Sequence, residues 1–170
     1  HQPISNETES IWVVLNGEIY NYQPLAEWLQ QRGHRLKTSS DTEVIVHLYE
    51  ELGEGCLDRL RGMFAFAVWD QSRSRLVVAR DRLGVKPLFY YWDHHRLVFG
   101  SELKTLLAHP DVETSLDVRA VEMYLRYSYI ADPHTIFEGI KKLPPGHYLT
   151  VEDGCLRIAP YWNGLLPDPI

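Results

Sequence analysis

Hydrophobic and polar positions near the start of the chain change from the spacing of a strand to that of a helix. Residues 11–15, IWVVL, form a continuous apolar, β-branched run that is short enough to be a buried strand. Pro24 then stands where the first turn of a helix tolerates proline, apolar residues recur with helical spacing up to Leu29, and Gly33 offers a stop. The pattern predicts a strand followed by an amphipathic helix.

A second helix is predicted within residues 38–53, TSSDTEVIVHLYEELG. Ser40 and Glu43 have the spacing of a capping box, in which each side chain bonds the backbone N–H of the other residue. Gly53 then ends the helix. Between these signals, apolar residues recur with a helical period: Val44, Ile45, Leu48 and Leu52.

From Gly62 onward the period becomes that of strands. Residues 62–70, GMFAFAVWD, are apolar at both alternating sets of positions, as in a strand whose sheet is covered on both faces. The segments RLVVARD, PLFYYWD and RLVFGS follow, joined by QSRS, RLGVK and DHH. These turns predict a hairpin-connected, largely antiparallel meander.

Helices return in the last part of the chain. We expect them over Glu102–Ala108 and Val118–Arg126, the second with Asp117 as its N-cap. Residues 137–146, FEGIKKLPPG, are predicted to be a loop that leads into a final strand pair, HYLTV and LRIAPYW, which turns at residues 152–154. Helices combined with two-faced antiparallel strands favour a layered α+β sandwich.

The composition supports a folded domain and narrows its partners. At 170 residues, of which 45% are hydrophobic, the chain is long enough for one domain with a substantial core. Its formal charge of −6 argues against nucleic acid and anionic membranes, and favours a small polar substrate or another protein. No apolar run approaches the ~20 residues of a membrane span.

The cysteines and histidines indicate neither a disulfide framework nor a metal site. Cys56 and Cys155 form no CxxC pair, so we expect plain core or surface cysteines and a reducing, cytoplasmic setting. The eight histidines are scattered along the sequence, with His94 and His95 in a turn. The sequence therefore predicts no metal-binding or general-base cluster.

Asn16, Gly17 and Glu18 directly follow the first predicted strand, and two interpretations fit them. Asn-Gly is a common turn pair. Alternatively, the Asn16 side-chain N–H and the Gly17 backbone N–H point to one place, as in an oxyanion hole, and glycine lets a substrate approach the backbone closely. Glu18 would then accept hydrogen bonds from an amide or ammonium group. Spacing alone favours the turn.

Two further polar segments have a structural and a functional interpretation. Asp41 is a carboxylate in the first turn of a helix, where it favours the helix dipole, but it is also placed to hold a substrate ammonium group. Composition alone favours the capping role. Residues 80–87, RDRLGVKP, are expected to form a salt-linked structural turn rather than a catalytic site.

Six segments in order strongly resemble the glutaminase domain of glutamine-dependent asparagine synthetases, a class II glutamine amidotransferase. They are LNGEIYNYQPLAEWL, TSSDTEVIVHLYEELG, LRGMFAFAVWD, VARDRLGVKPLFYY, VFGSELKTLLAHP and LPPGHYL with its closing PYW. The resemblance predicts this domain over residues 1–162 and the start of a linker over 163–170. The amidotransferase domains of glucosamine-phosphate synthase, phosphoribosyl-pyrophosphate amidotransferase and glutamate synthase are the nearest alternatives.

The resemblance implies a fold, a mechanism and residue roles. The fold is a four-layer N-terminal-nucleophile sandwich, with two antiparallel sheets between helical layers. An N-terminal cysteine thiolate attacks the side-chain amide of glutamine, with its own α-amino group as the base, and ammonia leaves through a channel. Asn16 and Gly17 then resemble the oxyanion hole, and Glu18 and Asp41 resemble the residues that hold the polar ends of glutamine.

The resemblance also implies partners. A separate synthetase domain of the same chain would use the ammonia to amidate aspartate with ATP and Mg²⁺, whereas the 170 residues themselves are expected to need no cofactor. A homodimer is a further possibility. No Cys-Gly start and no arginine-containing segment precede HQP at residues 1–3, so this piece is expected not to hydrolyse glutamine.

Two classes of function stay open at this point. One is the glutaminase half of an asparagine synthetase, or of a relative that amidates another carboxylate. The other is a non-catalytic amidotransferase-like domain that serves docking or dimerisation.

Overall fold

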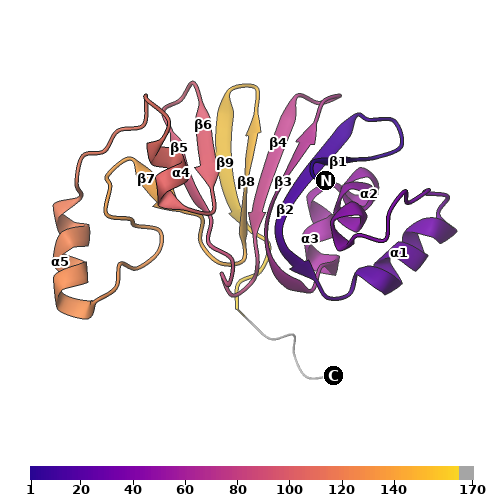
Figure 1. The fold of residues 1–170 in the computed structure, drawn as a ribbon, viewed down its shortest axis with the longest axis horizontal. Helices are drawn as coiled ribbons and strands as arrows, with labels where there is room; N and C mark the ends of the chain where they lie inside the picture. Colours follow the sequence, from indigo (N-terminus) through magenta and orange to yellow (C-terminus); the bar gives the residue numbers. More distant parts are fainter. Residues whose placement is uncertain (165–170) are drawn as a thin grey trace. The chain divides into compact units, whose positions relative to one another are not determined.

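The computed structural model describes residues 1–164, which form two compact units (Figure 1). One unit contains His1–Lys86 and the segment that begins at Gly146, and the other is Pro87–Pro145. Most of the predicted linker, residues 165–170, lies outside the described residues.

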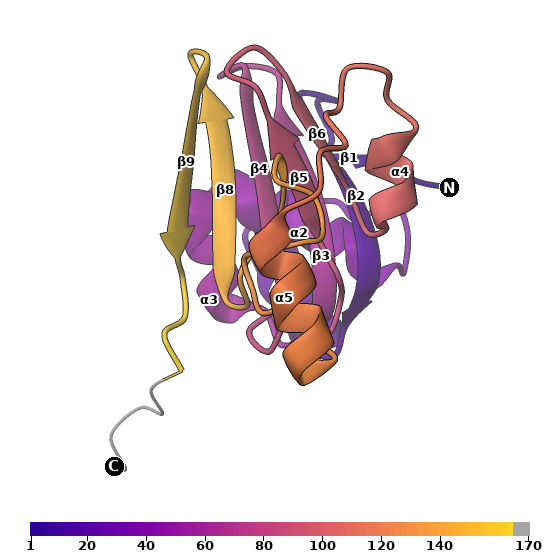
Figure 2. The same cartoon turned by 90° about the vertical axis from the view of Figure 1, so that its left-hand side faces the viewer.

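The first unit contains a six-stranded sheet in which every neighbouring pair of strands is antiparallel. In spatial order its strands are β1 (Ile4–Ser5), β2 (Ile11–Ile19), β3 (Gly62–Asp70), β4 (Arg75–Arg80), β8 (His147–Glu152) and β9 (Cys155–Pro160). β8 and β9 form the predicted hairpin, which Figure 2 shows from the side. Asp153 and Gly154 both have positive φ there, as the tight turn between twisted strands requires.

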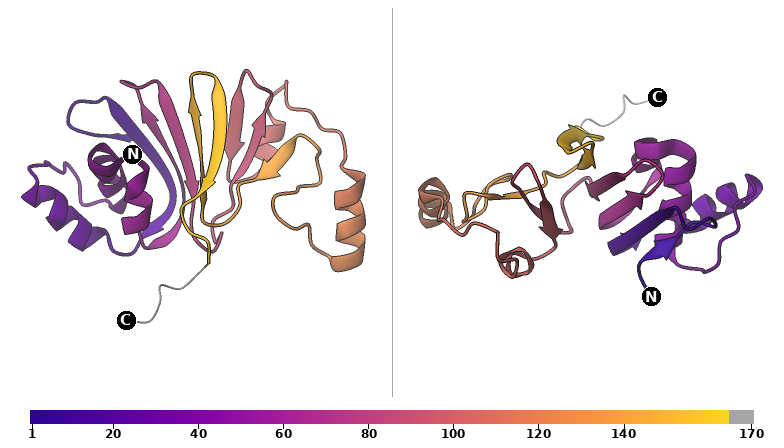
Figure 3. Two further views of the ribbon diagram at one scale, coloured as in Figure 1. Left: turned by 180° about the vertical axis from the view of Figure 1, so that it is seen from behind. Right: turned by 90° about the horizontal axis from the view of Figure 1, so that it is seen from above.

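Helices cover one face of this sheet, as Figure 3 shows for the side next to β2 and β3. They are α1 (Tyr22–Gln31), α2 (Asp41–Leu52) and α3 (Cys56–Arg59), with a 3₁₀ turn at Gly53–Gly55. Phe64, Phe66 and Val68 of β3 pack in the shared core at 1%, 3% and 0% exposure. The predicted burial of this strand is confirmed, although Trp69 near its end is 41% exposed.

β2 is longer and less buried than the sequence predicted. The strand does not end at Leu15 but pairs with β3 as far as Ile19, so the interpretation of Asn16-Gly17 as a turn is wrong. Val13 faces the core at 1% exposure, whereas Val14 is 40% exposed. Successive residues of β2 therefore face the core and the opposite side of the sheet in alternation.

α2 begins and ends where the sequence predicted, but its first turn is not a complete capping box. The Ser40 side chain accepts a hydrogen bond within the first turn, and Gly53 ends the helix with a φ of 56°. The buried Glu43 carboxylate instead accepts from the backbone N–H groups of Lys37 and Thr38, at 2.6 and 2.7 Å. Glu43 therefore fixes the loop that precedes α2.

The second unit is a three-stranded antiparallel sheet with two helices. Its elements are β5 (Phe89–Trp92), β6 (Leu97–Gly100), α4 (Leu103–Leu107), α5 (Val118–Tyr127) and β7 (Ile140–Lys142), with the strands in the order β6-β5-β7. Both predicted helices are confirmed, and the Asp117 side chain caps α5 by accepting from the N–H groups of Arg119 and Ala120. Leu106 and Ile140, both 0% exposed, form the centre of this core.

Two predictions about the strands are wrong. The meander is not continuous, because β4 pairs with β8 and β5 pairs with β7, so the chain leaves one sheet after β4 and enters the other at β5. Residues 137–146 are not only loop, because β7 lies within them. In both cases the pairing partner is distant in sequence, where local patterns carry no information.

The structural turn predicted after β4 is confirmed. The Asp81 carboxylate, 1% exposed, accepts hydrogen bonds from three backbone N–H groups of the turn at 2.9, 3.0 and 3.1 Å. Arg80 donates to two carbonyl oxygens of the same turn, at 2.8 and 2.9 Å. These bonds give the turn a fixed shape.

The elements together make an α+β protein with two antiparallel sheets, as the sequence predicted. Among the described residues, none of the helices combines the length and the apolar character that crossing a membrane requires.

Candidate functional site

The last residues of β2 direct backbone N–H groups to the strand edge that faces away from β3. The Leu15 N–H and carbonyl bond the Gln2 side-chain amide there, at 2.7 and 2.9 Å. The Ile19 N–H bonds the Asp41 carboxylate at 2.9 Å. Because backbone groups alternate between the two edges of a strand, the N–H of Gly17, midway between these residues, points to the same edge.

The neighbouring strand requires glycine at position 17. Its partner is Phe64, whose own N–H and carbonyl bond Asp81 on the side away from β2, so the two residues form a closely spaced pair without mutual hydrogen bonds. Gly17 has a φ of 150°, and a Cβ there would lie 2.1 Å from the Met63 carbonyl oxygen. The backbone of β3, rather than a substrate, fills the space that glycine leaves.

Asn16 and Glu18 are exposed on the face of β2 that is opposite the core, together with Val14. Positions two apart on one face of a strand are separated by about 7 Å. An amide and a carboxylate therefore lie side by side on this face, next to the strand edge to which the Gly17 N–H points.

Helix α2 brings Asp41 to this edge. Ser40 caps the helix, Asp41 is its first residue, and the Asp41 Oδ2 accepts from the Ile19 N–H, 22 positions away in sequence. The predicted proximity of Asp41 to the Asn16–Glu18 segment is confirmed. The glutamine-binding roles of these four residues remain predictions.

Neither cysteine offers a nucleophile at this edge. Cys56 begins α3 at 1% exposure, and burial, together with the charges of Glu54 and Asp58, raises the pKa of its thiol to about 12. A protonated thiol is a poor nucleophile at neutral pH. Cys155 is exposed on β9, at the other end of the strand order from β1 and β2. Both agree with the predicted core and surface roles.

The prediction that the histidines are scattered is wrong for two of them. The fold brings His34 and His47 together with Glu7 and Glu50, and their ring centroids are 5.0 Å apart. Only the spacing of His47 and Glu50 on one face of α2 was readable from the sequence. The loops that carry Glu7 and His34 had no signal that would have placed them beside this helix.

Comparison with known families identifies the class of domain. A family model described as "Glutamine amidotransferase domain" matches residues 1–162. The chain belongs to this family. It is 46% identical over 152 residues to the glutamine-hydrolysing asparagine synthetase 3 of Bacillus subtilis (strain 168), over 89% of this chain and 25% of that protein. It is 36% identical over 169 residues to the amidase chry2 of Gibberella zeae, over 99% of this chain and 24% of that protein.

A solved structure supports the fold of this amidotransferase domain. The glutamine phosphoribosylpyrophosphate amidotransferase from B. subtilis, complexed with ADP and GMP, matches 95% of this chain and 32% of that chain with a TM-score of 0.66. At 20% sequence identity this likeness shows the fold alone. In sequence, the chain spans about a quarter of the length of the two relatives named above.

Proposed function

We propose that this amidotransferase domain is the glutaminase part of a glutamine-hydrolysing asparagine synthetase. The observation that carries the proposal is the edge of β2, where the Gly17 N–H and the Asp41 carboxylate face the same side, next to the exposed Asn16 and Glu18. The family match over residues 1–162 and the 46% identity to an asparagine synthetase support it.

Asn16 and Gly17 would stabilise the charge that develops when a thiolate adds to the side-chain amide of glutamine. The amide oxygen becomes an oxyanion in that step, and the Asn16 side-chain N–H and the Gly17 backbone N–H would donate to it. One such donor contributes roughly 3 kcal/mol of transition-state stabilisation. The register of β2 and β3 fixes the direction of the Gly17 N–H in advance, so this donor needs no reorganisation.

Glu18 and Asp41 would hold the ammonium end of glutamine through their negative charges. The Ile19 N–H holds Asp41 Oδ2 in place. The other oxygen, Oδ1, lies 3.5 Å from the hydroxyl groups of Ser40 and Thr42, at the limit of hydrogen-bond distance. In our proposal Oδ1 accepts from the substrate, and Oδ2 keeps the carboxylate oriented.

The nucleophile and the acceptor reaction complete the proposal. Because Cys56 and Cys155 do not fit the role, we place the family's N-terminal nucleophilic cysteine outside these 170 residues. A synthetase domain of the same protein would use the ammonia to amidate aspartate with ATP and Mg²⁺. A relative that amidates another carboxylate is the alternative.

Asn16→Ala in the complete protein tests this function. We expect glutaminase turnover to fall on the order of 100-fold, because the oxyanion loses one of its donors. Synthesis from free ammonia should stay nearly unchanged, since no amide is cleaved in that reaction. The informative quantity is the ratio of glutamine-dependent to ammonia-dependent product formation.

Val14→Ala is the matched control, because Val14 lies on the same face of β2 two residues away and is also exposed. It should leave the ratio unchanged. If Asn16→Ala also leaves the ratio unchanged, the oxyanion role is wrong. If both activities fall together, Asn16 acts on folding rather than on glutamine.

A further inference from the structure

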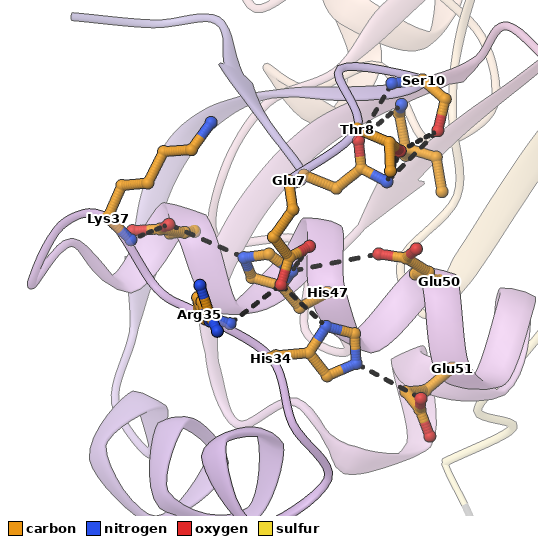
Figure 4. Close-up of polar contacts among 12 residues, drawn as sticks. Glu7, Thr8, Ser10, His34, Arg35, Lys37, His47, Glu50 and Glu51 are labelled. Atoms are coloured by element: carbon orange, nitrogen blue, oxygen red, sulfur yellow. Dashed lines mark hydrogen bonds and ion pairs between the residues drawn. The ribbon is translucent and has the colours of Figure 1, made fainter.

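Side chains from three separate segments meet beside α2 (Figure 4). Glu7 lies between two imidazoles, with Oε1 at 3.3 Å from His34 Nδ1 and Oε2 at 3.3 Å from His47 Nδ1. Glu50 Oε2 lies 4.0 Å from the same His47 nitrogen. One ligand-type atom of each of the four residues lies within 4.8 Å of all the others. Ligand atoms of a tetrahedral Zn²⁺ ion are about 3.3 Å apart, so small side-chain adjustments bring these atoms to metal-binding distances.

A second carboxylate lies next to the Nε2 atom of each imidazole ring. His34 Nε2 lies 3.2 Å from Glu51 Oε1, and His47 Nε2 lies 3.6 Å from Glu43 Oε1. Both rings therefore turn Nδ1 toward Glu7 and Nε2 toward another acidic side chain. Metal-binding histidines characteristically have such a partner on the other ring nitrogen, because it fixes the tautomer and the orientation of the ring.

The carboxylates around the buried His47 ring favour the binding of a cation. The ring is 1% exposed, and neither of its nitrogens makes a well-formed hydrogen bond within the described part of the chain. The Glu7 and Glu43 carboxylates lie 3.3 and 3.6 Å from its two nitrogens, and acidic groups gathered around a buried ring are disfavoured without a balancing positive charge.

We propose that Glu7, His34, His47 and Glu50 bind one Zn²⁺ ion. Two imidazoles with two carboxylates suit Zn²⁺, whereas Mg²⁺ prefers an octahedral shell of oxygen ligands. Glu7 and Glu50 are exposed and give the ion access from solvent, whereas His47 is buried.

The role of this zinc site is structural. The ion joins the loop that carries Glu7 and the loop that carries His34 to helix α2. The same helix begins at Asp41, six residues and about 9 Å of helix from His47. The site therefore fixes the segments around α2 and does not depend on the function proposed above.

Zinc titration of the intact, metal-stripped protein without a polyhistidine tag tests the proposal. Calorimetry at pH 7.5 should show one Zn²⁺ per chain, without competition from millimolar Mg²⁺. His34→Gln should weaken binding at least about 100-fold, because it removes a ligand. Glu51→Gln keeps all four ligands and should weaken binding about 10-fold to 100-fold through the lost partner of His34. His95→Gln, in the exposed turn between β5 and β6, is the control and should bind as the parent protein does.

Crystallography gives an independent test of the same site. Anomalous scattering at the zinc edge should place one ion between Glu7 and His47. Far-UV circular dichroism checks that each variant is folded. Absence of one-to-one binding by the folded parent protein, equal binding by His34→Gln and His95→Gln, or an anomalous peak elsewhere would each overturn the zinc site.

Discussion

At the scale of single residues, Gly17 shows how strand pairing limits what a site can contain. A Cβ at this position would lie 2.1 Å from the Met63 carbonyl oxygen and 2.7 Å from the Phe64 Cα, and both are backbone atoms that cannot rotate away. We therefore expect Gly17→Ala to lower the free energy of unfolding by about 3 kcal/mol or more, because β2 and β3 must separate. Urea unfolding followed by circular dichroism measures this loss.

Gly55→Ala is the control for this substitution. Gly55 has a φ of −59°, and an added Cβ would have Leu52 Cβ as its nearest neighbour, at 3.8 Å. Alanine fits this backbone, so the free energy of unfolding should stay the same or rise by about 0.4 to 1 kcal/mol. Similar losses in the two variants would contradict the close approach of β3 to Gly17.

The sequence predicted that Asp41 lies near the Asn16–Glu18 segment, but it did not predict the conformation of that segment. Asn16-Gly17 is a strong turn signal in isolation, and only pairing with Phe64, which local patterns do not encode, makes it part of a strand. Glu43 has the spacing of a capping box, but its carboxylate bonds the backbone N–H groups of Lys37 and Thr38 instead. Both errors arise where a tertiary contact competes with a local one.

At the scale of elements, the turn after β4 depends on one buried carboxylate. Asp81 accepts from three backbone N–H groups within the turn and from the Phe64 N–H of β3 at 3.3 Å. Asp81→Asn keeps the size of the side chain, but it replaces one accepting oxygen with an NH₂ group. This group cannot accept from the backbone N–H groups and is itself a donor that faces them. We expect a loss of about 2 to 4 kcal/mol in the free energy of unfolding, measured by urea titration.

Asp153→Asn makes the same chemical change in an exposed turn. Asp153 has a φ of 50°, a conformation that asparagine adopts as readily as aspartate, so the free energy of unfolding should change by less than about 0.5 kcal/mol. If the two variants lose the same stability, then the hydrogen bonds of Asp81 do not hold the turn.

Local patterns predicted elements well and their partners less well. The caps Ser40 and Asp117 and the turn at Asp153-Gly154 are local signals, and the structure confirms each of them. The separation of β4 from β5 and the existence of β7 depend on pairing between distant segments. Hydrophobic periodicity indicates that a strand exists, but it does not say which strand lies beside it.

At the scale of the whole molecule, the family resemblance supplied what local patterns could not. It placed Asp41 with the Asn16–Glu18 segment although the sequence separates them, and the bond between Asp41 and the Ile19 N–H confirms that Asp41 lies at the end of this segment. The family resemblance did not predict the cluster of His34 and His47 with Glu7 and Glu50. Glu7, His34 and His47 come from three segments that meet only in the folded chain.

Helix α5 exposes apolar side chains that are expected to contact the part of the complete protein outside these 170 residues. Val118, Leu125 and Tyr127 are 76%, 79% and 65% exposed. Val118 and Leu125 are two helical turns apart and lie on one face of α5, and exposed apolar side chains on one helix face indicate a surface that another part of a protein covers. Because the chain spans about a quarter of its relatives, we expect that in the complete protein the remaining sequence packs on α5.

Hydrogen exchange tests this expectation by comparing the 170-residue chain with the complete protein. Amides of α5 should exchange at least about 10-fold more slowly in the complete protein, because packing on the helix suppresses its local opening. α2 is the internal control: its residues from Thr42 to Tyr49 are already buried in this domain, so their protection should be the same in both proteins. Equal exchange of α5 in the two proteins, with α2 unchanged, would show that the remaining sequence does not cover this helix.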